Sequence, residues 1–536
     1  MARVLARLEG LASGKRGALL LFALALAAFA VRSIAWPLKS GRDLDEYLYA
    51  YVQLFDRDVL LPWSLLFRTP ITPLLAGVSL DAFGGRLAEP LMAVLYAGSI
   101  VCWAAAARFF GARVALAVAA VLLAYSGYAL MFHELSSEPV FAAVFAGWAL
   151  LVTRAAFAPS IGRFALVGLG VAVIALVRPG NAVLLAFGVI PLLLAGTWRV
   201  RLERTGAFFL AAALPLVAWT AHNGVRFDSW SLARGGNAIV PFYRAFITDN
   251  IVSPANGEQS RRLAAAMQAH LLTREPYRSY GVTLDQLFEE GSFRVHEDLY
   301  LLSDQVFGWK DDYRVLRDAG VEGVRANPGT YARGVARTIW DELAKAQFRV
   351  VSSDSDGSTP ASEPATVEVG GRTLPAPSEG EPIPAGQVVW ISRPDQSIRQ
   401  VWTSPTDWHF EFDRPADRPR LEQIRRDVDD LFEALPDRAG NEQLALRLNQ
   451  LSRWFPRPWM WILVGLIAIA VRRPRGWPMA LALSLAAFAV VTLNALGLFA
   501  DLHFLLPVAP AFVLLGLVGL LGQRRPRGPT DVALSS

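Results

Sequence analysis

Residues 86–132 read RLAEPLMAVLYAGSIVCWAAAARFFGARVALAVAAVLLAYSGYALMF. Two apolar runs, 86–107 and 114–132, flank a short link that carries Arg108 and Arg113. Each run has close to the roughly 20 residues that a helix needs to cross the hydrocarbon core of a bilayer. A helix also satisfies its own backbone hydrogen bonds, which lipid cannot do. The stretch therefore predicts two membrane-spanning helices joined by a basic turn.

The same alternation recurs along the whole chain, which is 53% hydrophobic and only 18% charged, whereas soluble domains carry nearer a quarter charged residues. We predict an all-α polytopic membrane protein with about ten spanning helices. The predicted spans are 17–37, 86–107, 114–132, 138–157, 164–178, 180–197, 205–221, 457–471, 477–498 and 503–521.

These spans divide the chain into three predicted parts. An N-terminal module of seven spans covers 1–221, and a C-terminal module of three spans with a tail covers 457–536. Between them, 222–456 forms a mainly helical, α or α+β domain, with helical character at 258–274, 284–302, 328–347 and 418–453. Within it, 352–388 is rich in Ser, Asp, Pro, Gly and Glu. This composition predicts a flexible linker or an inserted hairpin around Gly370 and Gly371.

The arginines between spans predict the orientation. With the N-terminus in the cytoplasm, every Arg cluster in a link falls on the cytoplasmic side, as the positive-inside rule requires. We therefore expect a multi-pass protein of the plasma (inner) membrane with both termini cytoplasmic, and with the loop 38–85 and the domain 222–456 outside. These turns also explain the net charge of +5, so we predict no nucleic-acid partner. The chain shows no nucleotide-binding fingerprint.

The first outer loop contains DLDEYLYAYVQLFDRD at 43–58. Its apolar residues recur at i, i+3, i+4, i+7, i+8 and i+11, which predicts a short helix at the membrane surface with its tyrosines toward the interface. Asp43 and Glu46 would share one polar side, and Asp45 would lie on a flank. These acids are either a solvated helix N-terminus or a general base facing a lipid-borne substrate, with or without a bound cation.

Two other outer groups have competing interpretations. His133, Glu134 and Glu138 suit either a divalent ion or a polar loop in which Ser136 or Ser137 caps the next helix. Arg178, Arg226, Arg234 and Arg244 lie on the outer side, against the positive-inside trend. They suit either phosphate binding or contact with lipid headgroups.

Several short motifs together resemble the GT-C glycosyltransferases, in particular the protein O-mannosyltransferases and the bacterial aminoarabinose transferases. The matching segments are Asp45-Glu46-Tyr47, Arg68-Thr69-Pro70-Ile71-Thr72-Pro73, Glu138, Arg178-Pro179, Trp219 to Phe227, Gly235-Gly236-Asn237 and His503 to Pro510. Together they cover roughly 17–245 and 457–521. His503 replaces the arginine of the late family motif, and 246–456 matches no soluble domain that we recognise.

The resemblance implies inverting transfer of a sugar from a polyprenyl-phosphate donor to an extracytoplasmic acceptor, which is a cell-envelope glycan, a lipid or a protein. Asp45 is the preferred base, with Asp43 or Glu46 otherwise. The four outer arginines and His503 would hold the donor phosphate, and His133 with Glu138 would hold any divalent metal ion. Membrane lipid is the remaining expected partner. The alternatives are a transporter or flippase of a lipid-linked substrate, which favours charges in span centres, and a non-catalytic scaffold.

Overall fold

The computed structural model describes residues 14–290, 295–344, 366–369, 372–375 and 387–523. Each of the ten predicted apolar segments contains helix. Their elements are α2 (Lys15–Ser33), α6 (Ala88–Ala107), α7 (Ala112–Ala124), α8 (Ser126–Met131), α9 (Ser137–Phe157), α10 (Ile161–Val177), η2 (Pro179–Val189), α11 (Ile190–Leu193), α12 (Trp198–Phe227), α20 (Pro458–Arg472), α21 (Trp477–Gly497), α22 (Leu502–Leu505) and α23 (Ala509–Leu521).

The length of these helices supports part of the predicted topology. Among the described residues, five helices are long and apolar enough to cross a membrane: α2, α6 with its 3-10 extension to Phe110, α9, α12 and α21. The other segments are shorter. The predicted span 180–197 differs most, because it consists of the 3-10 segment η2 followed by one turn of helix. Gly180 and Pro191 both disfavour a regular helix there.

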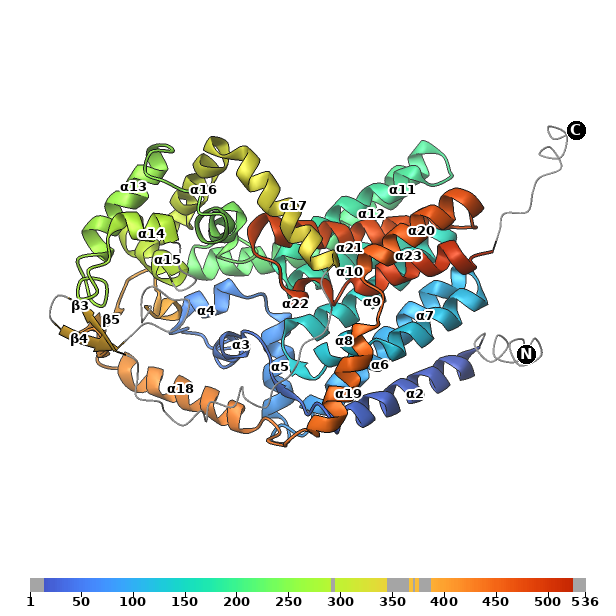
Figure 1. Cartoon of the computed structure of the whole chain (residues 1–536), viewed down its shortest axis with the longest axis horizontal. Helices are drawn as coiled ribbons and strands as arrows, with labels where there is room; N and C mark the ends of the chain where they lie inside the picture. Colours follow the sequence, from blue (N-terminus) through green and yellow to red (C-terminus); the bar gives the residue numbers. More distant parts are fainter. Residues whose placement is uncertain (1–13, 291–294, 345–365, 370–371, 376–386, 524–536) are drawn as a thin grey trace, which may run out of the picture.

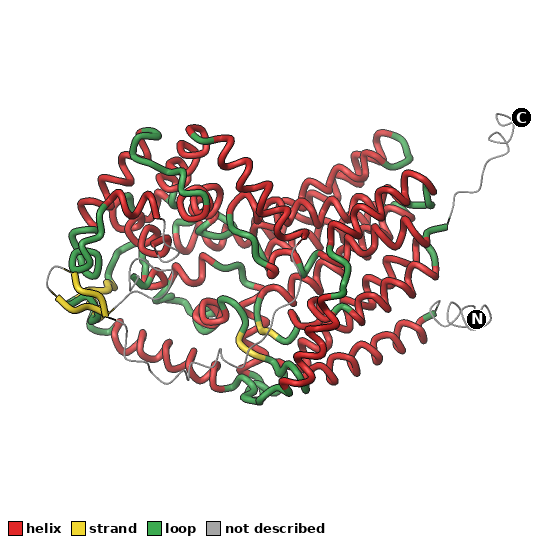
Figure 2. The backbone as a smooth tube through the Cα atoms, in the orientation of Figure 1, coloured by secondary structure: helices red, strands yellow, loops and turns green. Residues whose placement is uncertain are grey.

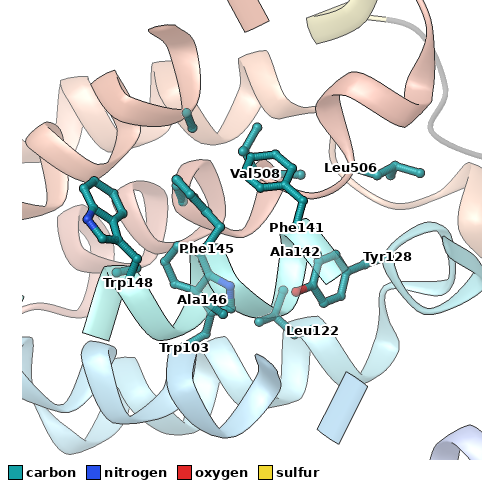
Figure 3. Packing of buried hydrophobic residues seen from close by; sticks show 14 of the residues in the cluster. Trp103, Leu122, Tyr128, Phe141, Ala142, Phe145, Ala146, Trp148, Leu506 and Val508 are labelled. Carbon is teal, nitrogen blue, oxygen red and sulfur yellow. The ribbon is translucent and has the colours of Figure 1, made fainter. Parts of the chain in front are cut away.

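The apolar helices form one bundle that occupies one half of the molecule (Figure 1). Their buried side chains belong to one continuous apolar core, to which α9 contributes on both of its sides. Figure 3 shows Phe145 and Trp148 of α9 among these side chains, with Trp103 of α6 on one side and Val508 of the C-terminal segment on the other. The N-terminal and C-terminal modules therefore share a core.

Glycines set the close approaches between helices. A Cβ on Gly168 of α10 would lie 2.0 Å from the backbone oxygen of Phe208 in α12. A Cβ on Gly519 of α23 would lie 2.9 Å from the backbone oxygen of Gly465 in α20. Small residues at such crossings are typical of helices that pack in a membrane, where close van der Waals contact replaces the hydrophobic effect.

The basic turns lie together at one end of this bundle. The N–H of Gln523, after α23, donates to the carbonyl of Phe110 at 3.5 Å, and the N–H of Arg475 donates to the carbonyl of Gln523 at 2.7 Å. Arg204 donates to the carbonyl of Pro159 at 3.5 Å. The prediction that these turns share one side is thereby confirmed. Which side of the membrane they face stays a prediction.

Most of the domain between α12 and α20 occupies the other half of the molecule and is mainly helical (Figure 2), whereas its last helix packs beside α8 and the end of α2. Its elements are η3 (Ala238–Thr248), α13 (Glu258–Ala266), η4 (Met267–Leu271), α14 (Leu284–Glu290), α15 (Val295–Val306), η5 (Trp309–Asp311), α16 (Arg314–Ala326), α17 (Pro328–Ala344), β3 (Thr366–Val369), β4 (Arg372–Pro375), η7 (Val389–Ile391), β5 (Ile398–Trp402), β6 (Trp408–Phe412), α18 (Asp417–Glu433) and α19 (Glu442–Arg453).

The domain contains helices in the segments predicted to be helical and a hairpin within the predicted linker or hairpin. Each of the four segments predicted to be helical contains helix, although 291–294 and 345–347 lie outside the described residues. Strands β3 and β4 pair antiparallel on either side of 370–371, as the hairpin alternative predicted, whereas most of 352–388 lies outside the described residues. A second hairpin, in which Ile398 faces Phe412 and Trp402 faces Trp408, was not predicted. The domain is therefore α+β.

The arrangement predicts how engineered cysteines will label. Arg199 is 89% exposed among the basic turns, and Arg314 is 59% exposed in the large domain. In a Cys102→Ser background, a membrane-impermeant maleimide should label Arg314→Cys in intact cells. It should label Arg199→Cys only after the membrane is permeabilised, because the two ends of the bundle face opposite compartments. Labelling of Arg199→Cys in intact cells would contradict the predicted orientation.

Candidate functional site

The first outer loop folds into α3 (Leu44–Tyr51), which begins directly after Asp43. Asp43 has a left-handed φ of 58°, and its carbonyl accepts the N–H of Tyr47 at 3.2 Å. Leu44, Tyr47 and Leu48 are buried, as the apolar stripe predicted. Tyr47 differs from the expectation of an interfacial tyrosine, because the protein itself covers it.

The cover over Tyr47 is Arg68, which lies between α4 (Pro62–Phe67) and α5 (Ile71–Asp81). Its guanidinium carbon is 5.1 Å from the ring centre of Tyr47 and 5.0 Å from that of Phe67. The same group is 3.0 Å from Asp43 and 2.6 Å from Glu46. One arginine therefore bridges two carboxylates that lie three residues apart on one side of α3.

Asp45 lies outside this bridge. Its side chain is exposed, whereas those of Asp43 and Glu46 are partly buried. The structure thus brings two of the three candidate bases together around Arg68 and leaves the third, which the sequence favoured, facing solvent.

A short parallel pairing joins the loop 38–85 to the segment between α8 and α9, which we call the second outer loop. Strand β1 (Lys39–Ser40) pairs with β2 (Glu134–Leu135), and Lys39 faces Glu134. A Cβ on Gly41 would lie 2.7 Å from that of Ser136 and 2.9 Å from the carbonyl oxygen of Leu135, so only glycine fits this approach. The pairing places Arg42 and Asp43 beside the second loop.

The turn before α22 joins the same region from the far end of the chain. Nη1 of Arg42 donates to Asp501 at 3.0 Å, and the guanidinium carbon of Arg42 lies 5.7 and 5.6 Å from the ring centres of Phe499 and Phe504. The backbone N–H of His503 donates to Asp501 at 3.0 Å. The ring nitrogens of His503 lie 3.9 Å from Glu134 and 4.0 Å from Asp501.

Arg178, which follows α10, is held beside Glu138 in the first turn of α9. The closest nitrogen and oxygen are 3.6 Å apart, and Glu138 is almost fully buried. Thr72 of the proline-bearing segment donates to the carbonyl of Val177 at 3.4 Å, so this segment links Arg68 to Arg178. Arg178 also lies 5.5 Å from the ring of Phe504.

Together these residues form what we call the charge cluster. Its members alternate in sign and come from the first outer loop, the second outer loop, the end of α10 and the turn before α22: Arg42, Asp43, Glu46, Arg68, Glu134, Glu138, Arg178, Asp501 and His503. Three guanidinium groups thus lie among five carboxylates, which favours retention of a proton by one of the acids.

Glu46 is that acid. Burial raises its pKa to about 7, and the negative charges of Asp43 and Asp45 add to the rise, although Arg68 opposes it. For Asp43, burial is outweighed by Arg68, Arg42 and Arg178, which hold its pKa below the usual value. Near neutral pH, Asp43 is therefore a fixed anion and Glu46 is poised to exchange a proton.

Two of the predicted phosphate-binding arginines have their guanidinium groups inside the protein. Arg234 is 1% exposed, pairs with Asp304 and donates to the carbonyl of Trp309 at 2.9 Å. Arg244 is equally buried and makes two bonds to Asp249, at 2.8 and 3.0 Å.

Arg244 also joins the domain to the bundle. It donates to Thr338 of α17 at 2.9 Å and to the carbonyls of Ala495 and Leu498 at 2.7 and 2.9 Å. Its donors are therefore engaged by protein acceptors. Arg226, the last of the four predicted arginines, lies near the end of α12 over the ring of Phe227, 5.2 Å from its centre.

The two predicted metal ligands have different partners. His133 is 1% exposed and stacks on Phe29 with ring centres 4.2 Å apart, while Glu138 pairs with Arg178. The described part of the chain contains no group of three or more His, Cys, Asp or Glu side chains that could hold a metal ion. His133 therefore fits an aromatic pocket better than a metal centre, and a metal requirement stays a prediction.

Sequence reasoning did not assign Arg42 or Asp501 to the site. Both lie in predicted outer segments, and Arg42 directly precedes the acidic motif, which is a usable signal. Nothing local indicates that they meet, because 459 positions separate them.

The burial of Arg244 predicts a structural effect. Arg244→Gln should lower the free energy of unfolding by about 3–5 kcal/mol, because it leaves the buried carboxylate of Asp249 without its cation. Thermal unfolding in detergent would measure the loss, and Arg244→Gln with Asp249→Asn should recover part of it. Unchanged stability together with weaker binding of a polyprenyl phosphate would instead assign Arg244 to the donor.

Comparison with solved structures finds two crystal structures of ArnT from Cupriavidus metallidurans. The undecaprenyl phosphate-bound form aligns with a TM-score of 0.36 at 13% identity, over 95% of this chain and 78% of that one. The apo form aligns with a TM-score of 0.32 at 13% identity, over 94% and 76%. No protein-family model and no curated protein matches the chain. The chain is thus similar to these two structures over most of its length, at low sequence identity.

Proposed function

We propose that the protein is an inverting glycosyltransferase that moves a sugar from a polyprenyl-phosphate donor to an extracytoplasmic acceptor. The observation that carries this proposal is the charge cluster, in which carboxylates and guanidinium groups converge at the ends of apolar helices. A polyprenyl phosphate holds its charged group at the membrane surface, so a site at helix ends can reach that group while the lipid tail stays in the bilayer.

The cluster supplies both groups that the transfer requires. A carboxylate accepts the proton of the acceptor hydroxyl, whose oxygen bonds to the anomeric carbon from the face opposite the phosphate. The bond between the anomeric carbon and the phosphate oxygen breaks, and its electron pair leaves with the lipid phosphate. Guanidinium groups stabilise the charge that develops on that phosphate.

Different members of the cluster suit different roles. The guanidinium groups of Arg42 and Arg178 both lie near the ring of Phe504. We assign their hydrogen-bond donors to the phosphate, with His503 beside them. Arg68 holds Asp43 and Glu46 in place. We assign the base to Glu46, because a pKa of about 7 suits proton transfer near neutral pH.

Single substitutions distinguish Glu46 from Asp45. Glu46→Gln should lower kcat by about 10²–10⁴-fold, the usual contribution of general-base catalysis. Asp45→Asn is the matched control, since it removes an exposed acid from the same helical turn. The assay is transfer or hydrolysis of a panel of radiolabelled polyprenyl-phosphate sugars. Loss of activity in Asp45→Asn alone would return the base to the residue that the sequence favoured.

The assignment of Glu46 also predicts a pH profile. A base acts when it is deprotonated, so kcat/KM should rise with pH and level off above the pKa of about 7. If Asp43 were the base, its lowered pKa would leave activity flat across neutrality. The measurement is kcat/KM from pH 5 to pH 9 at constant ionic strength.

The same panel tests the class of function. No sugar release from any donor, together with movement of labelled lipid across proteoliposomes, would support the flippase alternative. Activity that survives chelation by EDTA would show that the reaction does not require the predicted divalent ion. Activity that is lost with EDTA and restored by Mg²⁺ or Mn²⁺ would establish it.

A further inference from the structure

The large domain contains a cleft of about 740 Å³. None of the residues that line it belongs to the charge cluster. The cleft lies where the end of η4, the following turn, the end of α15 and strand β5 meet. Its walls are formed by His270, Thr273, Arg274, Glu275, Arg278, Gln305, Val306, Gln387, Gln396, Arg399, Gln400, Val401 and Trp402. In Figure 1, β5 lies at the edge of the domain, away from the helix bundle.

The walls are rich in amide groups that are held in place. Gln396 donates to the carbonyls of Asp304 and Gln305 at 3.4 Å. The side-chain oxygen of Gln400 accepts the N–H of Val388 at 2.6 Å, which fixes the orientation of its amide group. Four of the thirteen lining residues are glutamines and only three are apolar, so the cleft offers many hydrogen-bonding groups to a polar ligand.

Two hydrogen-bond donors of the walls lack an acceptor. Nε2 of Gln400 and Nε1 of Trp402 have no hydrogen-bond partner among the described residues. A buried donor without an acceptor destabilises the folded protein. Both atoms are buried, so they do not face the open cleft, but the indole of Trp402 is only partly buried and adds an apolar face to the lining.

The charge of the lining is positive. Arg274 is exposed, and its guanidinium group donates to an uncharged acceptor, the amide oxygen of Gln305, at 3.4 Å. Arg278 is 67% exposed and pairs with Glu275, the one carboxylate of the lining. Arg399 pairs with Asp413, outside the lining. Arg274 is thus the cation most available to a ligand, and guanidinium groups favour carboxylates and phosphates.

We propose that this cleft binds an anionic saccharide, a sugar chain that carries carboxylate or phosphate groups. Amides match hydroxyl groups because they both donate and accept, and Arg274 matches the acidic substituent. The link to catalysis rests on the proposed function: the saccharide would be part of the acceptor, held by the domain while its hydroxyl reaches the charge cluster. Binding itself does not depend on that link.

The test is a binding titration with the full-length protein in detergent. Tetragalacturonate is the acidic probe, and maltotetraose is the neutral probe of equal length. We expect tetragalacturonate to bind at least about tenfold more tightly at low salt, with the difference falling as salt rises. Arg274→Ala should weaken tetragalacturonate binding by about tenfold or more. Arg314→Ala, which removes an exposed arginine elsewhere in the domain, should not change it.

Three results would overturn the proposal: equal binding of the two probes, no binding of either, or equal effects of Arg274→Ala and Arg314→Ala. Glu46→Gln separates this proposal from the proposed function, because it should abolish transfer and leave tetragalacturonate binding intact. Tetragalacturonate binding without activity towards any lipid-linked donor would support the saccharide site and contradict the glycosyltransferase assignment.

Discussion

The bridge from Arg68 to Asp43 and Glu46 is the interaction on which the rest of the site depends. Two carboxylates this close repel each other, and burial strengthens that repulsion because the surroundings screen it poorly. A guanidinium group 3.0 Å from one and 2.6 Å from the other makes the arrangement possible. Tyr47 and Phe67 keep that group in a partly dry position, with their ring centres about 5 Å from it.

The helix bundle restricts where the side chains of the charge cluster can lie. A charged side chain is costly inside an apolar bundle, so its members collect where helices end and loops begin. Arg42 and Asp501 illustrate the consequence. Their pairing ties the first outer loop to the turn before α22, and the shared apolar core of the N-terminal and C-terminal modules places these two segments side by side. The charge cluster is therefore a product of how the bundle packs.

What the sequence could predict follows from the range of each interaction. Apolar runs predicted the helical segments, and the composition around two adjacent glycines predicted a flexible linker or a hairpin, because both depend on residues near in the chain. The spacing of Asp43 and Glu46 placed both acids on one side of a helix for the same reason. The sequence could not separate Arg178 from Arg234 and Arg244, since all three are arginines on the predicted outer side. Only the fold shows that the last two are buried against Asp304 and Asp249.

The alternating charges also suggest how donor binding and proton transfer are coupled in the proposed reaction. In the structure, the arginines of the cluster already contact carboxylates, so a lipid phosphate must compete with those carboxylates for the same donors. A carboxylate that loses part of its arginine contact becomes more basic, because the positive charge that lowered its pKa is now shared with the phosphate. Asp43, which Arg68, Arg42 and Arg178 hold as an anion, would respond most strongly. The negative charge of the phosphate would also raise the pKa of Glu46, since an anion beside an acid disfavours its ionisation. Arrival of the donor would therefore strengthen the base at the moment when the anomeric carbon is in place.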